Sequence, residues 1–262
     1  MAGRSKRQKT MITLETKNPV AIESPDHIAP VGTVNDNTTD ADYITAVKKH
    51  FGKPIKMMDL GCAGGQLVVD FIESGDYGVG LEGSTNARER GAGKHNWDKY
   101  GDKNLFTVDL TKPYQLYDDG EEVKFDFITT WEVVEHIAEE DLPMFFGNIK
   151  KHLKDDGVFC CSIAVVRDDV GYIDGKLVSR HQSVFNSAKW INILFDNGFE
   201  LAVDPSWPAA PAGLEYAHHP DKPAGVVAKP HGLFFGYLFG DAMFRNHNDR
   251  GNSIYFCLTK KS

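Results

Sequence analysis

The sequence predicts an α/β fold in which parallel strands alternate with helices. Short apolar runs of strand length alternate with longer segments whose apolar residues have helical spacing. A glycine-rich turn, Gly61 to Gly65, joins the first run to a helix-like segment, and glycines at such a turn accept positive φ and let a ligand approach the backbone. Four runs also carry an acidic residue at or near the end where open α/β sheets bind ligands, namely Asp59, Glu82, Asp109 and Glu132.

An N-terminal region of different character precedes these elements. Residues 1–10 form a basic tail, and residues 11–37 lack periodicity and are rich in Pro, Asp, Asn and Thr, which predicts an extended arm. A helix is expected at 40–51, where apolar residues have helical spacing. We therefore expect a tail and arm over residues 1–39 and one domain over residues 40–262.

Strand and helix patterns alternate in the rest of the chain. Strands are expected at 55–60, 77–81, 105–108, 125–131, 158–164, 199–203 and 253–259, and helices at 66–74, 87–100, 140–153 and 187–197. Ser187 is the expected N-cap of the last helix. The segment 204–252 is far longer than a hairpin loop needs, and its aromatic residues predict a substrate-covering insertion, with an oligomer contact as the alternative.

Length, charge and cysteine content bound the class of protein. A chain of 262 residues with 41% hydrophobic residues is long and apolar enough for a packed core. No apolar run approaches the roughly 20 residues that span a bilayer, and the first residues lack the apolar segment of a secretory signal, so we expect no membrane span and a cytoplasmic location. The formal charge of −8 opposes nonspecific binding to phosphate backbones, so a nucleic-acid partner is not expected. The four cysteines show no metal or disulfide spacing and are expected to be buried thiols.

Five segments between residues 55 and 199 carry a resemblance to a known family. They are MDLGCAGG, VGLEGS, FTVDLTKP, FDFITTWEVVEHI and LKDDGVFCCSIA, in this order. With them the chain resembles a class I S-adenosylmethionine-dependent methyltransferase. The resemblance implies a Rossmann-like three-layer sandwich around a mostly parallel seven-stranded sheet with an antiparallel last strand. It also implies S-adenosylmethionine as the cofactor.

The same resemblance implies which residues bind the cofactor. They lie in the glycine turn and at the strand ends that follow it: Asp59, Gly61, Gly64, Glu82, Asp109, Leu110 and Thr130. Glu82 would bind the ribose hydroxyls, and Asp109 would accept a hydrogen bond from the adenine amino group, unless Asp109 caps a turn or a helix. The arm residues His27, Thr33 and Asn37 either line the active site or belong to a packing strap.

The residues expected to carry chemistry follow the fourth and fifth strands of the domain. Glu132, Glu135 and His136 would lie on one face of a helical turn, and His181 follows the fifth strand. His181 has three possible roles, as the general base for a hydroxyl proton, as a metal ligand, or as a histidine that only holds its loop together. Arg180 beside it would either hold an anionic group of the substrate or be an exposed arginine. Glu132 and His181 are the expected catalytic residues.

The Glu-x-x-Glu-His pattern also resembles a metal-binding element. It occurs in ubiquinone-pathway O-methyltransferases and in small-RNA 2′-O-methyltransferases, and the latter use a second histidine after the fifth strand. The pattern is also frequent in methyltransferases without a metal, and metal-free chemistry is the favoured expectation. If a divalent metal is present, its ligands would be Glu132, Glu135, His136 and His181, and the hard carboxylate oxygens would favour magnesium or manganese over zinc.

The methyl acceptor is expected to be a hydroxyl group of a small molecule or of a sugar or glycan. The Asn/Asp-Pro-Pro-Tyr element of DNA amino-methylating enzymes is replaced by TTWE after the fourth strand, and the Pro-Cys pair of cytosine C5 enzymes does not occur. Two alternatives stay open, an RNA 2′-O-methyltransferase with a divalent metal and a noncatalytic cofactor-binding protein. The sequence predicts no particular oligomeric state.

Overall fold

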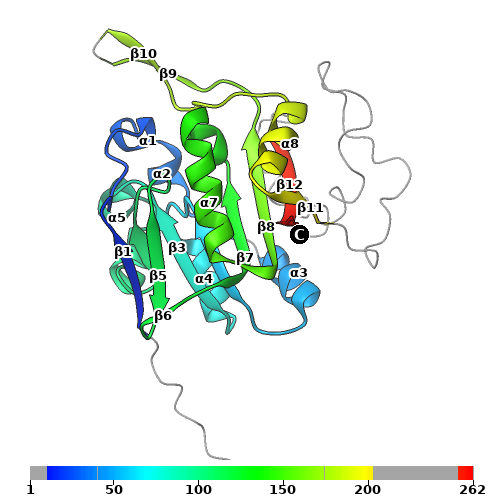
Figure 1. The fold of residues 1–262 in the computed structure, drawn as a ribbon. Coiled ribbons are helices and arrows are strands. Elements are labelled where there is room, and N and C mark those ends of the chain that lie inside the picture. Colours follow the sequence, from blue (N-terminus) through cyan, green and yellow to red (C-terminus); the bar gives the residue numbers. More distant parts are fainter. Residues whose placement is uncertain (1–10, 40, 174, 203–252, 262) are drawn as a thin grey trace, which may run out of the picture.

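A seven-stranded sheet forms the centre of the computed structural model, which describes residues 11–39, 41–173, 175–202 and 253–261 (Figure 1). In spatial order, the strands are β11 (Phe199–Leu201), β12 (Ser253–Lys260), β8 (Leu153–Ala164), β7 (Phe125–Trp131), β2 (Lys56–Leu60), β3 (Tyr77–Glu82) and β4 (Leu105–Thr107). Neighbouring strands are parallel except at β12, which is antiparallel to both β8 and β11. The predicted mostly parallel sheet with an antiparallel last strand is confirmed.

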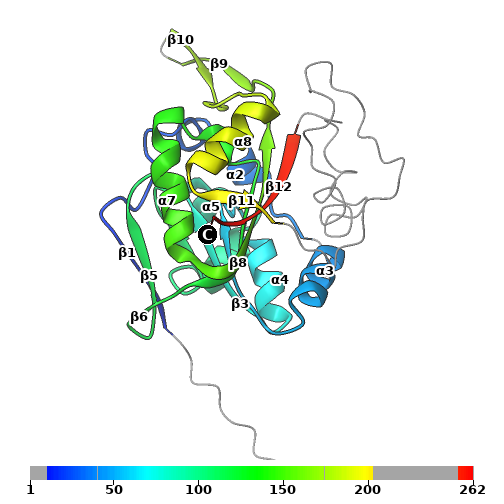
Figure 2. The ribbon, with the colours of Figure 1, turned by 45° about the vertical axis from the view of Figure 1, so that its right-hand side comes forward.

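Helices cover both faces of this sheet and complete three layers (Figures 1 and 2). One face carries α3 (Ala41–Phe51), α4 (Gln66–Glu73) and α6 (Lys94–Tyr100), and the other carries α7 (Leu142–His152) and α8 (Ser187–Asp196). Because successive strand residues point to opposite faces, the neighbours Met57 and Met58 belong to two different apolar clusters. All four cysteines are buried thiols, as expected.

The predicted helix at 87–100 is in fact two helices, α5 (Asn86–Arg90) and α6. The break contains Gly91 and Gly93. A Cβ atom on Gly93 would lie 2.2 Å from Cα of Gly64, so the chain here rests directly on the glycine turn. The prediction was wrong because the polar pattern of the sequence continues across both glycines. The glycines are needed for a backbone contact with the glycine turn, which is distant in sequence.

The arm is also more structured than the extended segment predicted. β1 (Ile12–Thr16) pairs antiparallel with β5 (Tyr114–Asp118), and β6 (Glu121–Glu122) completes a small second sheet. Two single-turn helices follow, α1 (Pro25–Ile28) and α2 (Gly32–Asn35). Such short elements depend on their tertiary contacts and leave little periodicity in the sequence.

The remaining differences from the predicted elements are local. β8 begins already at Leu153, and the side chain that caps α8 is that of Asn186 rather than Ser187. A hairpin of β9 (Asp169–Ile173) and β10 (Lys176–Ser179) follows β8 and projects from the body (Figure 1). The predicted insertion at 204–252 and the basic tail lie outside the described residues. Among the described helices, none has the length and apolar character needed to cross a lipid bilayer.

Candidate active site

The glycine turn between β2 and α4 is held against the end of β3. The N–H groups of Gly61 and Cys62 donate to the carbonyl oxygen of Leu81 over 2.7 and 3.1 Å. Gly61 has a φ of 72°, in the left-handed region that favours glycine, and a Cβ atom on it would lie 2.4 Å from Cγ2 of Val133. The turn is therefore fixed between β3 and the segment after β7, with no room for a side chain.

Glu82, the last residue of β3, has a buried carboxylate beside this turn. Its Oε2 accepts a hydrogen bond from the N–H of Ala63 over 2.9 Å, and its Oε1 accepts one from the N–H of Ser84 over 3.0 Å. Burial raises the pKa of Glu82 to about 7, although these N–H donors lower it in part. Each carboxylate oxygen has a further lone-pair site, so Glu82 can also accept hydrogen bonds from the hydroxyls of a ligand.

Asp59 is a second buried acid at the same end of the sheet. Its Oδ1 accepts a hydrogen bond of 2.7 Å from the hydroxyl of Thr129. Burial raises the pKa of Asp59 to about 7, and the charge of the nearby Glu82 contributes to the rise. Thr130, beside it on β7, is fully buried, and its hydroxyl has no hydrogen-bond partner within the described part of the chain. A positively charged ligand would stabilise the ionised forms of both carboxylates.

Asp109 lies two residues beyond β4 and closes a turn. Its Oδ1 accepts hydrogen bonds from the N–H and the hydroxyl of Thr111 over 2.9 and 2.6 Å. This is the turn role that the sequence left open, and Oδ2 takes no part in it. Leu110 is buried, and its carbonyl accepts a hydrogen bond of 3.1 Å from Nδ2 of Asn148 on α7.

The arm crosses this edge of the sheet and is bonded to the strand ends. Backbone hydrogen bonds hold it from Asp109 N to Asn18 O (2.9 Å), from Ala21 N to Gly83 O (2.8 Å), from Gly64 N to Asp36 O (3.0 Å) and from Ala92 N to Val34 O (2.7 Å). Nδ1 of His27 lies 3.0 Å from Oγ of Ser84, and Oδ1 of Asn37 accepts a hydrogen bond of 3.2 Å from Asn96. Thr33 lies half-buried in α2. These contacts are those of a strap over the glycine turn and the end of β3.

Glu132 does not share a helical face with Glu135 and His136, so this expectation is wrong. The turn after β7 is the short 3₁₀ helix η1 (Val134–His136), and Glu132 precedes it with a φ of 51°. The Oε2 atom of Glu132 accepts a hydrogen bond of 2.8 Å from the hydroxyl of Ser253 on β12. Positive φ in a residue other than glycine is a strained conformation that often occurs at functional sites.

Glu135, His136 and His181 form a compact cluster at the carboxyl end of β7. One potential ligand atom from each lies within 4.8 Å of the others. The rings of His136 and His181 meet edge to face, with centroids 4.7 Å apart. The carboxylate of Glu135 is fully buried, and neither of its oxygens has a hydrogen-bond partner among the described residues. Burial, reinforced by the charge of Glu132, raises the pKa of Glu135 to about 8.

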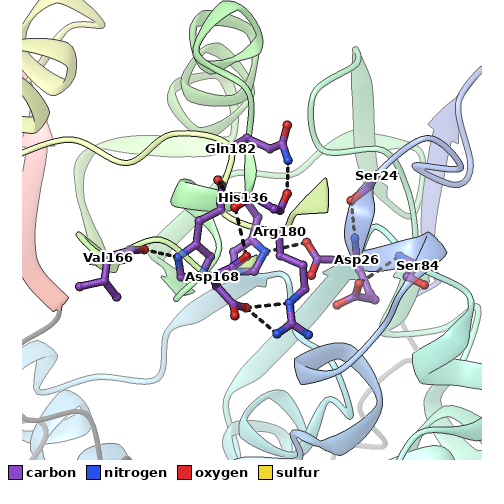
Figure 3. A network of polar contacts seen from close by, with 11 residues as sticks. Ser24, Asp26, Ser84, His136, Val166, Asp168, Arg180 and Gln182 are labelled. Atoms are coloured by element: carbon purple, nitrogen blue, oxygen red, sulfur yellow. Dashed lines mark hydrogen bonds and ion pairs between the residues drawn. The ribbon is translucent and has the colours of Figure 1, made fainter. Parts of the chain in front are cut away.

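Each histidine of the cluster has its Nδ1 atom engaged. Nδ1 of His136 lies 2.7 Å from Oδ2 of Asp26, and Nδ1 of His181 lies 2.5 Å from the carbonyl oxygen of Val166 (Figure 3). Burial lowers the pKa of His136, but the hydrogen bond and charge of Asp26 outweigh it and raise this pKa above its ordinary value. Burial lowers the pKa of His181, and the neighbouring His136 lowers it further. His181 is therefore the more readily neutral of the two imidazoles near pH 7.

Arg180 is mostly buried and so differs from the exposed arginine considered from the sequence. Its Nε and Nη2 atoms lie 2.7 and 2.5 Å from Oδ2 of Asp168 (Figure 3). Its Nη1 atom is buried and has no hydrogen-bond partner within the described segments. The two N–H donors of Nη1 are thus left without an acceptor among the described residues.

The structure adds Asp26 to the residues singled out from the sequence. Ser24 and Pro25 are typical of a helix start, and the hydroxyl of Ser24 accepts a hydrogen bond from the N–H of Asp26. These signals predict a local helix cap. They do not indicate that Asp26 reaches a histidine far along the chain, which only the tertiary structure shows.

The mostly parallel sheet with one antiparallel strand, and the glycine turn after its strand β2, define a Rossmann-like α/β fold of the class I methyltransferase type. A family model described as a methyltransferase domain matches residues 38–202, so the chain belongs to that family. It is a class I S-adenosylmethionine-dependent methyltransferase, and S-adenosylmethionine is its cofactor. The fold and cofactor expected from the sequence are thereby confirmed.

Two known proteins share sequence with part of the chain. A ubiquinone biosynthesis O-methyltransferase of Bartonella bacilliformis is 33% identical over 106 residues, which are 40% of this chain and 39% of that protein. A sphingolipid C9-methyltransferase of Komagataella phaffii is 30% identical over 131 residues, covering 45% of this chain and 25% of that protein. The chain thus matches well under half the length of each relative.

Solved structures with the same fold cover most of the chain. A methyltransferase from Clostridium acetobutylicum has a TM-score of 0.51 and 12% identity, covering 86% of this chain and 94% of its own. A TehB-like methyltransferase from Corynebacterium glutamicum has a TM-score of 0.50 and 15% identity, covering 85% and 90%. The glycopeptide N-methyltransferase MtfA in complex with S-adenosyl-L-homocysteine has a TM-score of 0.50 and 12% identity, covering 89% and 95%. At these identities the likeness concerns the fold alone.

Proposed function

We propose that this methyltransferase transfers its methyl group to a hydroxyl of a small molecule or of a sugar or glycan, with His181 as the general base. The hydrogen bond from Nδ1 of His181 to the carbonyl of Val166 carries the proposal. If Nδ1 keeps its proton for this bond, Nε2 has a free lone pair, and the lowered pKa of His181 keeps the ring neutral. The O-methyltransferase named above supports a hydroxyl acceptor.

The residues at the carboxyl edge divide into a cofactor side and an acceptor side. On the cofactor side we assign Asp59, Gly61 and Gly64 to the methionine end, Glu82 to the ribose hydroxyls, and Asp109, Leu110 and Thr130 to the rest of the nucleoside. The raised pKa values of Asp59 and Glu82 suit a cationic ligand that carries hydroxyl groups.

Methyl transfer needs little from the protein beyond alignment and removal of one proton. The sulfonium of the bound cofactor activates the methyl group for in-line displacement by the acceptor oxygen. Nε2 of His181 takes the hydroxyl proton as the oxygen–carbon bond forms, and the spare Nη1 donor of Arg180 holds an oxygen atom of the acceptor. Glu132, tied to Ser253, is the alternative base.

A divalent cation is the second candidate on the acceptor side, and the unpaired buried carboxylate of Glu135 favours it. Glu135, His136 and His181 would hold the ion, which would bind the acceptor oxygen and lower its pKa. Glu132 is outside this group because its carboxylate bonds Ser253. One carboxylate with two imidazoles suits manganese or zinc better than the magnesium expected from two carboxylates.

Incubation with methyl-labelled S-adenosylmethionine and fractionated cell extract tests the proposal. We expect label in a small-molecule or glycan fraction, strongly reduced label with His181→Ala, and unchanged label with His95→Ala, which replaces an exposed histidine of α6. The same assay with EDTA separates the two mechanisms, since loss of activity that manganese or zinc restores would establish the cation. Label found only in RNA would refute the small-molecule acceptor, and cofactor binding without label in any fraction would indicate a noncatalytic binding protein.

A further inference from the structure

The strap formed by residues 17–39 connects the two sides of the site. On the cofactor side it bonds the turn after β4, the end of β3 and the glycine turn. It also lies directly on the glycine turn, because a Cβ atom on Gly64 would be 2.4 Å from Oδ1 of Asn37 and 2.7 Å from the carbonyl oxygen of Asp36. A nucleoside bound at these strand ends would therefore be covered by the strap.

On the acceptor side the strap supplies Asp26. Its carboxylate accepts a hydrogen bond of 2.7 Å from Nδ1 of His136, and both side chains are about four-fifths buried, with relative exposures of 21% and 19%. Asp26 is held in place by α1, where the hydroxyl of Ser24 caps the helix. Buried carboxylate–imidazole pairs of this kind fix the orientation of the ring and the position of its proton.

We propose that Asp26 is a positioning residue that keeps a proton on Nδ1 of His136 and directs Nε2 into the acceptor site only while the strap is closed over the cofactor. The inference rests on the proposed function for its cofactor side. In the open state His136 loses its partner on Nδ1, and its ring is free to rotate or to move its proton to Nε2. Closure of the strap over the cofactor therefore also sets the orientation and proton position of His136 in the acceptor site.

Nitrogen NMR of labelled protein tests this directly, because the shifts of Nδ1 and Nε2 show which atom carries the proton of a neutral imidazole. At a pH where His136 is neutral, we expect the Nδ1–H form in the parent and a majority of the Nε2–H form in Asp26→Asn. The control Glu23→Gln changes an exposed acid of the same arm and should leave the parent spectrum. An unchanged proton position in Asp26→Asn would overturn the proposal.

Hydrogen exchange tests the link to strap closure. Amide exchange at Ala21 and Asp109 should be about tenfold faster in Asp26→Asn than in the parent, because a charged hydrogen bond that holds the strap is lost. Addition of S-adenosylhomocysteine should raise the Nδ1–H fraction of His136 in the parent and not in Asp26→Asn. Equal exchange rates, or the same response of both proteins, would contradict the coupling.

Two further measurements keep the outcomes distinct. Circular dichroism shows whether Asp26→Asn is folded, and Asp26→Glu, which keeps the carboxylate, should recover the Nδ1–H form at least in part. Calorimetric titration of the parent with S-adenosylhomocysteine tests the cofactor side by itself. If no binding is seen, the proposed cofactor site is wrong, whereas the proton position of His136 in Asp26→Asn still decides the role of Asp26.

Discussion

Replacement of Glu82 by Gln should weaken the binding of S-adenosylhomocysteine about thirtyfold. The carboxylate is buried, and its remaining lone pairs are the proposed acceptors for the ribose hydroxyls. Each of the two ribose hydroxyls would exchange a charged acceptor, which contributes about 2 kcal/mol, for a neutral one, which contributes about 1 kcal/mol. The total loss of about 2 kcal/mol corresponds to about thirtyfold in Kd. Gln is nearly isosteric, so the volume of the pocket is kept.

The raised pKa of Glu82 should also make the binding of S-adenosylhomocysteine depend on pH. If the cofactor product binds the ionised form, the competent fraction is about 9% at pH 6 and about 91% at pH 8 for a pKa of about 7. Ionisation of Glu82 by itself should therefore lower the Kd of the parent about tenfold as the pH rises from 6 to 8. Asp59, whose pKa is also about 7, is kept in Glu82→Gln, so the difference between the two pH slopes belongs to Glu82.

Isothermal titration at pH 6, 7 and 8 measures both effects. Glu89→Gln, which changes an exposed acid on α5, is the matched control and should bind like the parent. Thermal unfolding shows whether the loss of the bonds to Ala63 and Ser84 has disturbed the turn. A Kd of Glu82→Gln within twofold of the parent, together with equal pH slopes, would refute the assignment of this strand end.

Three other predictions concern the turn and the acceptor side. Gly61→Ala should destabilise the fold by about 1–3 kcal/mol and also weaken cofactor binding, because the added Cβ atom collides with Val133 and position 61 has a positive φ. A melting temperature equal to that of the parent would contradict this, since it would mean that the turn relaxes around the methyl group. His181→Ala should lower turnover about a hundredfold or more and leave the Kd of S-adenosylhomocysteine within twofold of the parent. Normal turnover in this variant would rule out His181 as the base and favour Glu132 in that role. Glu135→Gln should raise stability at pH 8 by a few kcal/mol but not at pH 4, measured in EDTA. The folded-state pKa of Glu135, about 8, lies above its ordinary value, so between these two values the native state holds a proton that the unfolded chain releases. The native state therefore loses stability as the pH rises from about 4.5 to about 8. Equal gains in stability at pH 4 and pH 8 would contradict this reasoning.

Much of the sheet could be predicted because its signals are local. An apolar run that ends in a glycine turn and a helix, as at β2, has few alternative structures, and Glu82 follows from its position at the end of the next strand. The helix at 87–100 was predicted as continuous because the contact that breaks it joins Gly93 to Gly64, far apart in sequence. The helical face predicted for Glu132 is wrong because its backbone N–H bonds Ser162 on β8 and its carboxylate bonds Ser253 on β12, and both contacts join distant segments.

The sequence by itself therefore determined the order of strands and helices, the glycine turn and the acids at the strand ends beside it, because strand ends in a parallel sheet meet at one edge whatever the loops do. Only the tertiary structure decided the acceptor side. Asp26 meets His136 across 110 residues, and His181 reaches the same cluster from the segment after the β9–β10 hairpin. Such contacts arise from the packing of distant segments against one another, and periodicity and spacing along the chain carry no record of them.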